Sequence, residues 1–82
     1  MIYVYAIQSL KDGRIYVGMN EDVDKRIFQH NSGHTFSTKG FCPWKLIYTE
    51  TFPNRIEARK KEKYFKSGIG KEFLKSIVSN PR

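Results

Sequence analysis

The chain has 82 residues and a mass of 9.7 kDa, which is enough for one small core and excludes a two-domain enzyme or a doubly wound nucleotide-binding fold. Fifteen lysines and arginines against eight acidic residues give a net charge of +7, and residues 42–82 alone carry 10 − 4 = +6. This excess of positive charge indicates a polyanionic partner such as a nucleic acid, although a solvated lysine-rich surface gives the same count.

Residues 1–82 are expected to form a single domain with a frayed tail at 79–82. The only cysteine, Cys42, cannot form an internal disulfide, which argues against a small secreted domain. No apolar run has the length of a membrane span or a signal peptide. We therefore expect a cytoplasmic protein with no membrane partner.

The first two elements in chain order are two strands of a hairpin. Residues 2–9 are rich in β-branched and aromatic side chains, and Lys11-Asp12-Gly13 is typical of a tight turn before a returning strand at 14–18. A loop of two or of four residues is compatible with the sequence, and either one places Tyr5 and Tyr16 on the same face of the sheet. Aromatic packing alone would explain this pair.

The rest of the chain alternates helical and extended patterns. We expect a helix capped by Asn20 or Asp22 and extending to about Asn31, a loop at 32–43, a strand at 44–52, a helix at about 55–67 capped by Asn54, and a short helix at 71–78. The order ββαβαα predicts an α+β fold in which a small three-stranded antiparallel sheet is flanked by helices.

Two polar residues lie on or beside the inward face of the first expected helix. Val23 and Ile27 define its apolar stripe, His30 lies on the same stripe, and Arg26 borders it. A snorkelling arginine and a hydrogen-bonded core histidine would explain this placement without any function. A site on the sheet would also explain it.

Glu62 occupies a similar position on the second expected helix. Ala58 and Phe65 share a face, and Glu62 lies between them within a strongly basic segment. A salt bridge to Lys66 four residues later is the alternative explanation. Taken together, two tyrosines, an arginine, a histidine and a carboxylate facing one small sheet suit phosphodiester hydrolysis. A carboxylate can hold a divalent cation, an arginine can neutralise phosphoryl charge, and tyrosine and histidine can move protons.

These residues resemble the motifs of the GIY-YIG nucleases. Tyr3-Val4-Tyr5 stands for the first tripeptide of that family and Tyr16-Val17-Gly18 for the second. Arg26 and His30 follow at the spacing of the family's helix, and Glu62 takes the place of its metal-binding glutamate. The resemblance covers residues 2–75 and is greatest to the small stand-alone bacterial branch, which is related to junction-cleaving nucleases and to the excision-repair incision subunit.

The resemblance implies an endonuclease that uses one divalent cation, Mg²⁺ or Mn²⁺, in DNA repair or recombination. It assigns the general base to Tyr5, positioning of the nucleophile and phosphate to Tyr16, transition-state stabilisation to Arg26, proton transfer or tyrosine orientation to His30, and metal binding to Glu62. The chain departs from longer members in lacking a clear equivalent of a supporting asparagine near the end of the domain. Asn80, in the expected tail, is a poor substitute.

DNA is the expected partner and RNA the alternative. The small size of the chain also leaves room for a protein partner in substrate recognition. A non-catalytic nucleic-acid-binding module on the same fold is the second functional hypothesis. The expected nucleic-acid-binding residues are Lys39, Lys45, Arg59, Lys60, Lys61, Lys63 and Lys66.

Overall fold

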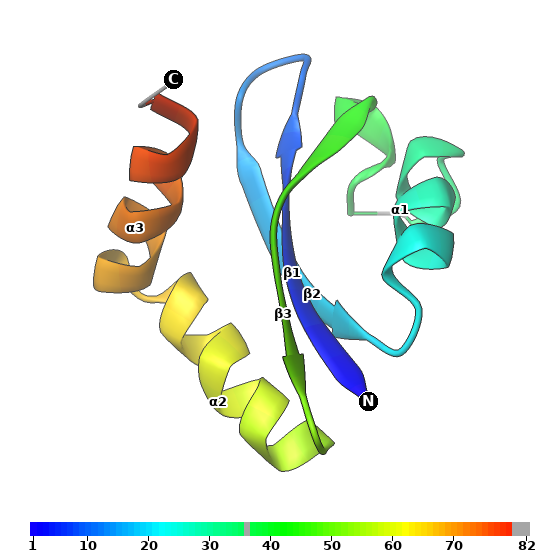
Figure 1. Ribbon diagram of the computed structural model, residues 1–82. Coiled ribbons are helices and arrows are strands. Elements are labelled where there is room, and N and C mark those ends of the chain that lie inside the picture. The colour runs from blue at the N-terminus through cyan, green and yellow to red at the C-terminus, as the bar shows by residue number, and fades with distance from the viewer. Residues whose placement is uncertain (36, 80–82) are drawn as a thin grey trace.

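The fold has three layers, in which a sheet separates one helix from two others (Figure 1). It is known from a computed structural model, which describes residues 1–35 and 37–79. The strand order β2-β1-β3 leaves β2 and β3 at the two edges, and both pairings are antiparallel. The elements are β1 (Ile2–Ser9), β2 (Ile15–Asn20), α1 (Val23–Asn31), the short 3₁₀ helix η1 (Lys39–Phe41), β3 (Trp44–Phe52), α2 (Arg55–Lys66) and α3 (Gly68–Ser79). The predicted order ββαβαα and the three-stranded antiparallel sheet are confirmed.

The hairpin between β1 and β2 has the longer of the two loops that the sequence allowed. Ser9 N–H donates to the Arg14 carbonyl at 2.8 Å, which leaves four residues in the loop. Ile7 therefore pairs with Tyr16, and Tyr5 pairs with Gly18. Because alternate residues of a strand share a face, this register places Tyr5 and Tyr16 on the same side of the sheet.

Side-chain caps determine where the helices begin. The Asp22 side chain accepts a hydrogen bond from the Lys25 backbone, and Asn54 does the same for Glu57 at the start of α2. Ser67 follows the end of α2 and accepts a bond from the Gly70 N–H with its hydroxyl. This cap starts α3 at Gly68, earlier than the predicted 71, and the helix includes Ser79. The rest of the expected tail, 80–82, lies outside the described residues.

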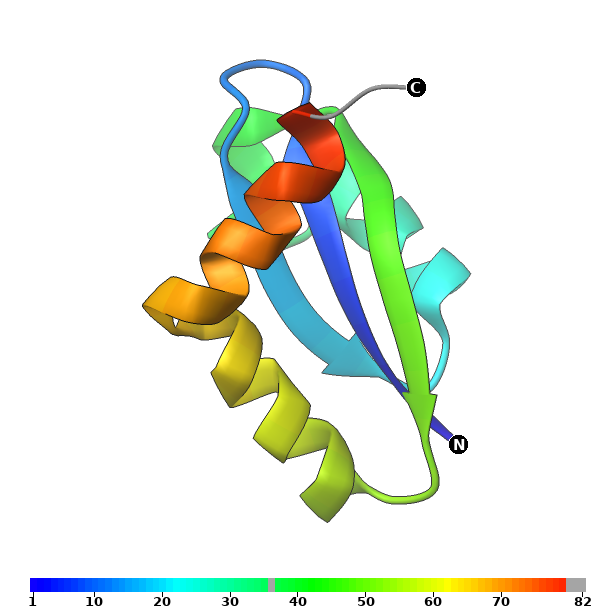
Figure 2. The same ribbon diagram turned by 60° about the vertical axis from the view of Figure 1, so that its left-hand side comes forward.

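The two faces of the sheet carry separate apolar clusters. Figure 2 shows α2 and α3 crossing one face, with α1 behind the sheet. The cluster beneath α2 and α3 contains Ile2, Val4, Ala6, Val17, Ala58, Phe65 and Leu74. The cluster beneath α1 is centred on Tyr5, Ile7 and Trp44, and Tyr16, Val23, Ile27, Phe41 and Cys42 pack against it. Within the described residues, no helix is long and apolar enough to cross a membrane.

Candidate active site

Tyr5 lies across its neighbour Gly18 toward the free edge of the sheet. Tyr5 is 1% exposed and belongs to the central strand β1, whereas Gly18 belongs to the edge strand β2. A Cβ atom on Gly18 would lie only 2.7 Å from the Tyr5 hydroxyl oxygen and 3.3 Å from a ring carbon of Tyr16. The glycine therefore provides the space in which the Tyr5 hydroxyl reaches the β2 edge.

Helix α1 brings His30 into direct contact with both tyrosines. His30 is fully buried, and its Nε2 atom is 3.0 Å from the Tyr5 hydroxyl oxygen. Its ring packs edge-on against Tyr16 with the ring centroids 5.1 Å apart. His30 thus lies on the inward face of α1, as the periodicity of Val23 and Ile27 predicted.

Arg26 lies one helical turn before His30 and is half-buried. Its Nη1 donates a hydrogen bond of 2.9 Å to the Gln29 side-chain oxygen, which helps to fix the guanidinium. The same guanidinium acts on the two groups of the tyrosine–histidine pair. Burial raises the pKa of Tyr5, and Arg26 opposes this rise by a hydrogen bond and by its charge; burial lowers the pKa of His30, and the charge of Arg26 lowers it further.

Tyr5 and His30 are both neutral at physiological pH. Burial is the main cause in each case, because it disfavours the charged form. Burial and then the charge of Arg26 lower the pKa of His30 from 6.5 to about 4. Burial raises the pKa of Tyr5, and the hydrogen bond from Arg26 opposes that rise. A neutral imidazole beside a neutral phenol can accept the phenol proton.

Thr38 is a member of this cluster that the sequence did not indicate. Its hydroxyl oxygen is 2.7 Å from Nδ1 of His30, and the residue is 1% exposed. Its carbonyl accepts a 3.0 Å hydrogen bond from the indole N–H of Trp44, which is itself buried. Trp44 is thus a core residue.

Glu62 reaches the site from the opposite layer. It belongs to α2, which lies on the other face of the sheet from α1 (Figure 1). Its carboxylate nevertheless raises the pKa of Tyr5, so it acts on the same hydroxyl as Arg26 does. Both α1 and α2 contact β2, and an ion pair of 3.6 Å joins Arg55 of α2 to Glu21 at the end of β2.

The structure brings three of the five predicted catalytic residues into contact. Tyr5, Tyr16 and His30 are in direct contact, and Arg26 and Glu62 act on the Tyr5 hydroxyl through their charges. Asn80, the weak substitute for the supporting asparagine, lies outside the described residues.

One carboxylate is available at the site for a cation. The Glu62 side chain is 17% exposed, and its Oε2 atom is 3.3 Å from the ammonium of Lys66. Within residues 1–35 and 37–79, no group of three or more histidine, cysteine or acidic side chains is arranged to hold a metal. A single carboxylate fits Mg²⁺, which keeps several waters and takes its other ligands from substrate phosphate oxygens. It does not fit a structural zinc site.

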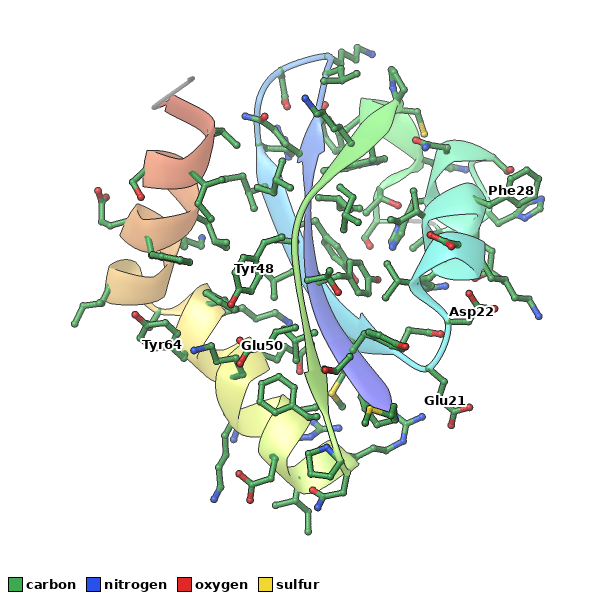
Figure 3. The ribbon with its side chains drawn as sticks, viewed as in Figure 1. Glu21, Asp22, Phe28, Tyr48, Glu50 and Tyr64 are labelled. Carbon is green, nitrogen blue, oxygen red and sulfur yellow. The ribbon has the colours of Figure 1, made fainter. Side chains whose placement is uncertain are left out.

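Other acidic side chains are engaged elsewhere. Figure 3 shows Glu21 and Asp22 beside α1, and Tyr48 and Glu50 on the other side of the sheet, toward α2. Glu50 accepts a 2.8 Å hydrogen bond from the Tyr48 hydroxyl and lies 3.9 Å from the Lys61 ammonium. Burial, together with this bond to Glu50, raises the pKa of Tyr48 to about 12. Glu50 thus belongs to a structural contact between β3 and α2.

The basic residues of α2 differ in their relation to Glu62. At 100° per residue, Arg59 and Lys66 lie within about 60° of Glu62 around the helix axis, whereas Lys60 lies about 160° away. Lys60 is also paired with Glu57 at 3.6 Å. The predicted nucleic-acid-binding residues of this helix are Arg59, Lys60, Lys61, Lys63 and Lys66.

Two further predicted nucleic-acid contacts come from outside α2. Lys45 is exposed on β3, which is the edge strand opposite β2, so it is separated from the β2 edge by the width of the sheet. Lys39 is exposed at the start of η1, in the segment that also carries Thr38. Both lysines follow residues that contact the tyrosine–histidine cluster: Lys39 follows Thr38, and Lys45 follows Trp44, whose ring packs against Tyr16 and His30.

Comparison with known proteins identifies the family. The model of the GIY-YIG catalytic domain matches residues 1–73, a range that contains all five predicted catalytic residues. The chain belongs to the GIY-YIG family. Its relatives include the UPF0213 protein of Staphylococcus saprophyticus, which is 38% identical over 76 residues that cover 92% of each chain. The UPF0213 protein of Clostridium perfringens is 39% identical over 80 residues, which cover 96% of this chain and 85% of the relative.

A solved structure supports the same assignment. The solution NMR structure of a UPF0213 protein from Bacillus halodurans has 40% sequence identity and a TM-score of 0.56, and the match covers 99% of this chain and 89% of that chain. The resemblance to small members of the GIY-YIG nuclease superfamily is thus confirmed over almost the full length. The match places β1, β2, α1 and α2, which carry the five candidate residues, inside the GIY-YIG catalytic domain.

Proposed function

We propose that this GIY-YIG protein is a metal-dependent endonuclease that hydrolyses phosphodiester bonds of DNA. One observation carries the proposal: the buried hydroxyl oxygen of Tyr5 lies 3.0 Å from Nε2 of His30. Burial raises the pKa of this hydroxyl, and the charges of Arg26 and Glu62 also act on it. A structural aromatic pair would need neither charge. The four groups have the types that general-base catalysis at an anionic phosphate requires.

The pair of Tyr5 and His30 supplies a proton path. In the proposed step, the Tyr5 oxygen takes a proton from the attacking water while its own proton passes to Nε2 of His30. The water oxygen forms the new bond to phosphorus, the bond to the leaving oxygen breaks, and that oxygen takes a proton from solvent. This coupled transfer avoids a free phenolate, which burial of Tyr5 would make costly. Tyr16 packs against His30 and borders the space above Gly18, which suits a positioning role.

Arg26 links substrate binding to this proton path. A scissile phosphate beside Arg26 would neutralise the charge that helps to keep the pKa of His30 low. The imidazole would then become a stronger base when the substrate is bound. Arg26 would also stabilise the charge that develops on the phosphoryl oxygens, where charge-assisted hydrogen bonds from arginine are strongest.

Glu62 would hold the divalent cation, Mg²⁺ or Mn²⁺. When bound, the cation supplies Lewis-acid stabilisation of the phosphate and of the leaving oxygen. The ammonium of Lys66 is paired with the Glu62 carboxylate, but the Lys66 side chain is 55% exposed. Exposed ion pairs of this kind contribute about 0–1 kcal/mol, so a cation can displace the ammonium at little cost.

The same ion pair is the observation that favours the second candidate, a nucleic-acid-binding module without catalysis. If Lys66 keeps the Glu62 carboxylate neutralised, the basic residues of α2 would bind phosphates but no metal would be held. Such a module would bind DNA with an affinity that falls with salt, because neutralised phosphates release counterions. It would not cleave DNA in any divalent cation.

Glu62→Gln separates the two candidates. Labelled single-stranded, duplex, flap and junction DNA, with matched RNA, would be incubated with Mg²⁺, Mn²⁺ or EDTA. We expect metal-dependent cleavage by the wild type, and a loss of at least about 100-fold, or about 2.7 kcal/mol, in Glu62→Gln with DNA binding retained. Cleavage of flaps or junctions in preference to plain duplex would support a role in DNA repair or recombination.

Glu57→Gln is the matched control for this experiment. It makes the same change of charge in the same helix, at an exposed residue whose partner is Lys60. We expect this variant to cleave at the wild-type rate. Divalent-dependent cleavage by Glu62→Gln at the wild-type rate would place the metal elsewhere, and binding without cleavage by the wild type would favour the module.

A further inference from the structure

Thr38 is a buried threonine that contacts the far side of the His30 ring. Its hydroxyl oxygen is 2.7 Å from Nδ1 of His30, whereas Nε2 of the same ring faces Tyr5. The Thr38 hydroxyl has a second neighbour, the carbonyl oxygen of Thr35, at 3.4 Å. The hydrogen bond from the Trp44 indole N–H to the Thr38 carbonyl holds the Thr38 backbone in place.

The balance of donors and acceptors selects one tautomer of His30. A neutral imidazole carries one N–H, and the position of that proton depends on the partner of each nitrogen. With the proton on Nδ1, three hydrogens find acceptors: Nδ1–H donates to Thr38, the Thr38 hydroxyl donates to the Thr35 carbonyl, and the Tyr5 hydroxyl donates to Nε2. The buried hydroxyls are then fully satisfied by the described residues.

The other tautomer leaves a buried hydroxyl without an acceptor. With the proton on Nε2, His30 would donate to the Tyr5 oxygen, and the Tyr5 hydrogen would need another acceptor. Among the other groups that act on Tyr5, Arg26 is the one with a hydrogen bond to it, and a guanidinium carries donors only; Tyr16 and Glu62 act on Tyr5 through charge alone. Leaving a buried donor unsatisfied is costly, so the Nδ1–H form is favoured.

We propose that Thr38 is a positioning residue that holds His30 in the Nδ1–H tautomer and so presents a bare Nε2 nitrogen to Tyr5. This inference rests on the proposed function for its catalytic meaning, but the tautomer is a property of the folded protein alone. Without Thr38, the imidazole would turn an N–H toward the Tyr5 hydroxyl and could not accept its proton. Thr38 touches no reacting atom and acts through His30.

NMR of the ¹⁵N-labelled wild-type protein tests the tautomer directly. Long-range ¹H–¹⁵N correlations at pH 7 distinguish a protonated ring nitrogen from a bare one. We expect His30 to show a protonated Nδ1 and a bare Nε2, while the exposed His34 averages both forms and provides an internal reference. A wild-type His30 with its proton on Nε2 would overturn the proposal, and this result needs no variant and no nuclease activity.

Two variants extend the test to the role of the hydroxyl. Thr38→Val keeps the shape and removes the acceptor, so His30 should change to the Nε2–H form, whereas Thr38→Ser should keep the wild-type tautomer. We expect kcat to fall about 10-fold to 100-fold in Thr38→Val with KM unchanged, and to stay within about threefold in Thr38→Ser. An unchanged tautomer in folded Thr38→Val would refute the role of Thr38. Absence of cleavage by the wild type would refute the proposed function and leave the NMR result to decide the tautomer.

Discussion

Gly18→Ala is the smallest change that should disturb Tyr5 without touching it chemically. The added Cβ would lie 2.7 Å from the Tyr5 hydroxyl oxygen and 2.9 Å from the carbon that carries it. Non-bonded heavy atoms are most stable at about 3.5–4.0 Å, so the ring must move by roughly 0.7 Å to restore even a tight contact. Tyr5 is 1% exposed, so its neighbours in the core would have to move with it.

The displacement has two measurable costs. Overpacking a buried site costs about 1–3 kcal/mol, and stretching the 3.0 Å bond between Tyr5 and His30 to about 3.7 Å would end it as a hydrogen bond. Replacing a strand glycine by alanine returns roughly 0.5–1 kcal/mol of backbone entropy. We therefore expect a net loss of about 1–3 kcal/mol in the free energy of unfolding, and a fall in cleavage rate of about 10-fold to 100-fold.

Urea unfolding and the cleavage assay would be run on Gly18→Ala beside Gly40→Ala. The position of a Cβ on Gly40 has no atom within 4 Å, so that variant should unfold within about 0.5 kcal/mol of the wild type and cleave normally. Wild-type stability together with a wild-type rate in Gly18→Ala would show that Tyr5 does not occupy the place above Gly18. The unfolding result stands even if the protein is not a nuclease.

Three further predictions concern the second helix layer, the buried histidine and the basic helix. Gly70→Ala should lower the free energy of unfolding by about 3 kcal/mol or more in urea, because its Cβ would strike the backbone at the end of α2, whereas Gly68→Ala has open space and should not. The pKa of His30 is about 4 in the folded protein, below its unfolded value of 6.5. The neutral imidazole therefore contributes at most about 3 kcal/mol to the free energy of unfolding, and this contribution is complete above pH 6.5 and is lost as pH falls toward 4. His30→Gln should flatten this part of the curve of stability against pH. Arg59→Ala should weaken DNA binding and reduce its salt dependence more than Lys60→Ala does, and equal effects would contradict the assignment of the Glu62 side of α2 to the substrate.

Local patterns were sufficient to predict most of the fold and the inward-facing residues. Strand alternation places Tyr5 and Tyr16 on one face whichever loop length is chosen, and helical periodicity places His30 on the inner stripe of α1. Asn54 was recognisable as a cap, and Asp22 as one of two candidates with Asn20, because short polar side chains before an apolar-periodic segment satisfy the first free N–H groups. These features depend on residues close in sequence.

Features that depend on distant contacts were not predictable. Thr38 lies in a loop of small polar residues, where no periodicity distinguishes a buried hydroxyl from an exposed one, and its burial depends on Trp44 and His30. The predicted start of α3 at 71 is too late, because the local pattern marks Ser67 only as the end of α2, whereas its hydroxyl also caps the next helix. The sequence also could not indicate that Glu62 belongs to the opposite layer from Arg26.

The proposed site, with residues on both faces of the sheet, would lie at the β2 edge. A carboxylate on α2 and a guanidinium on α1 lie on opposite faces of the sheet, so a phosphate that contacts both would have to bind where the sheet ends. Gly18 makes this geometry available, because a side chain at that position would keep the Tyr5 hydroxyl away from the edge. A free edge strand invites pairing with another strand, and charged side chains beside it oppose that pairing. Arg26 and Glu62 therefore suit the edge on two grounds: they discourage strand addition there, and they leave its approach open to a phosphate.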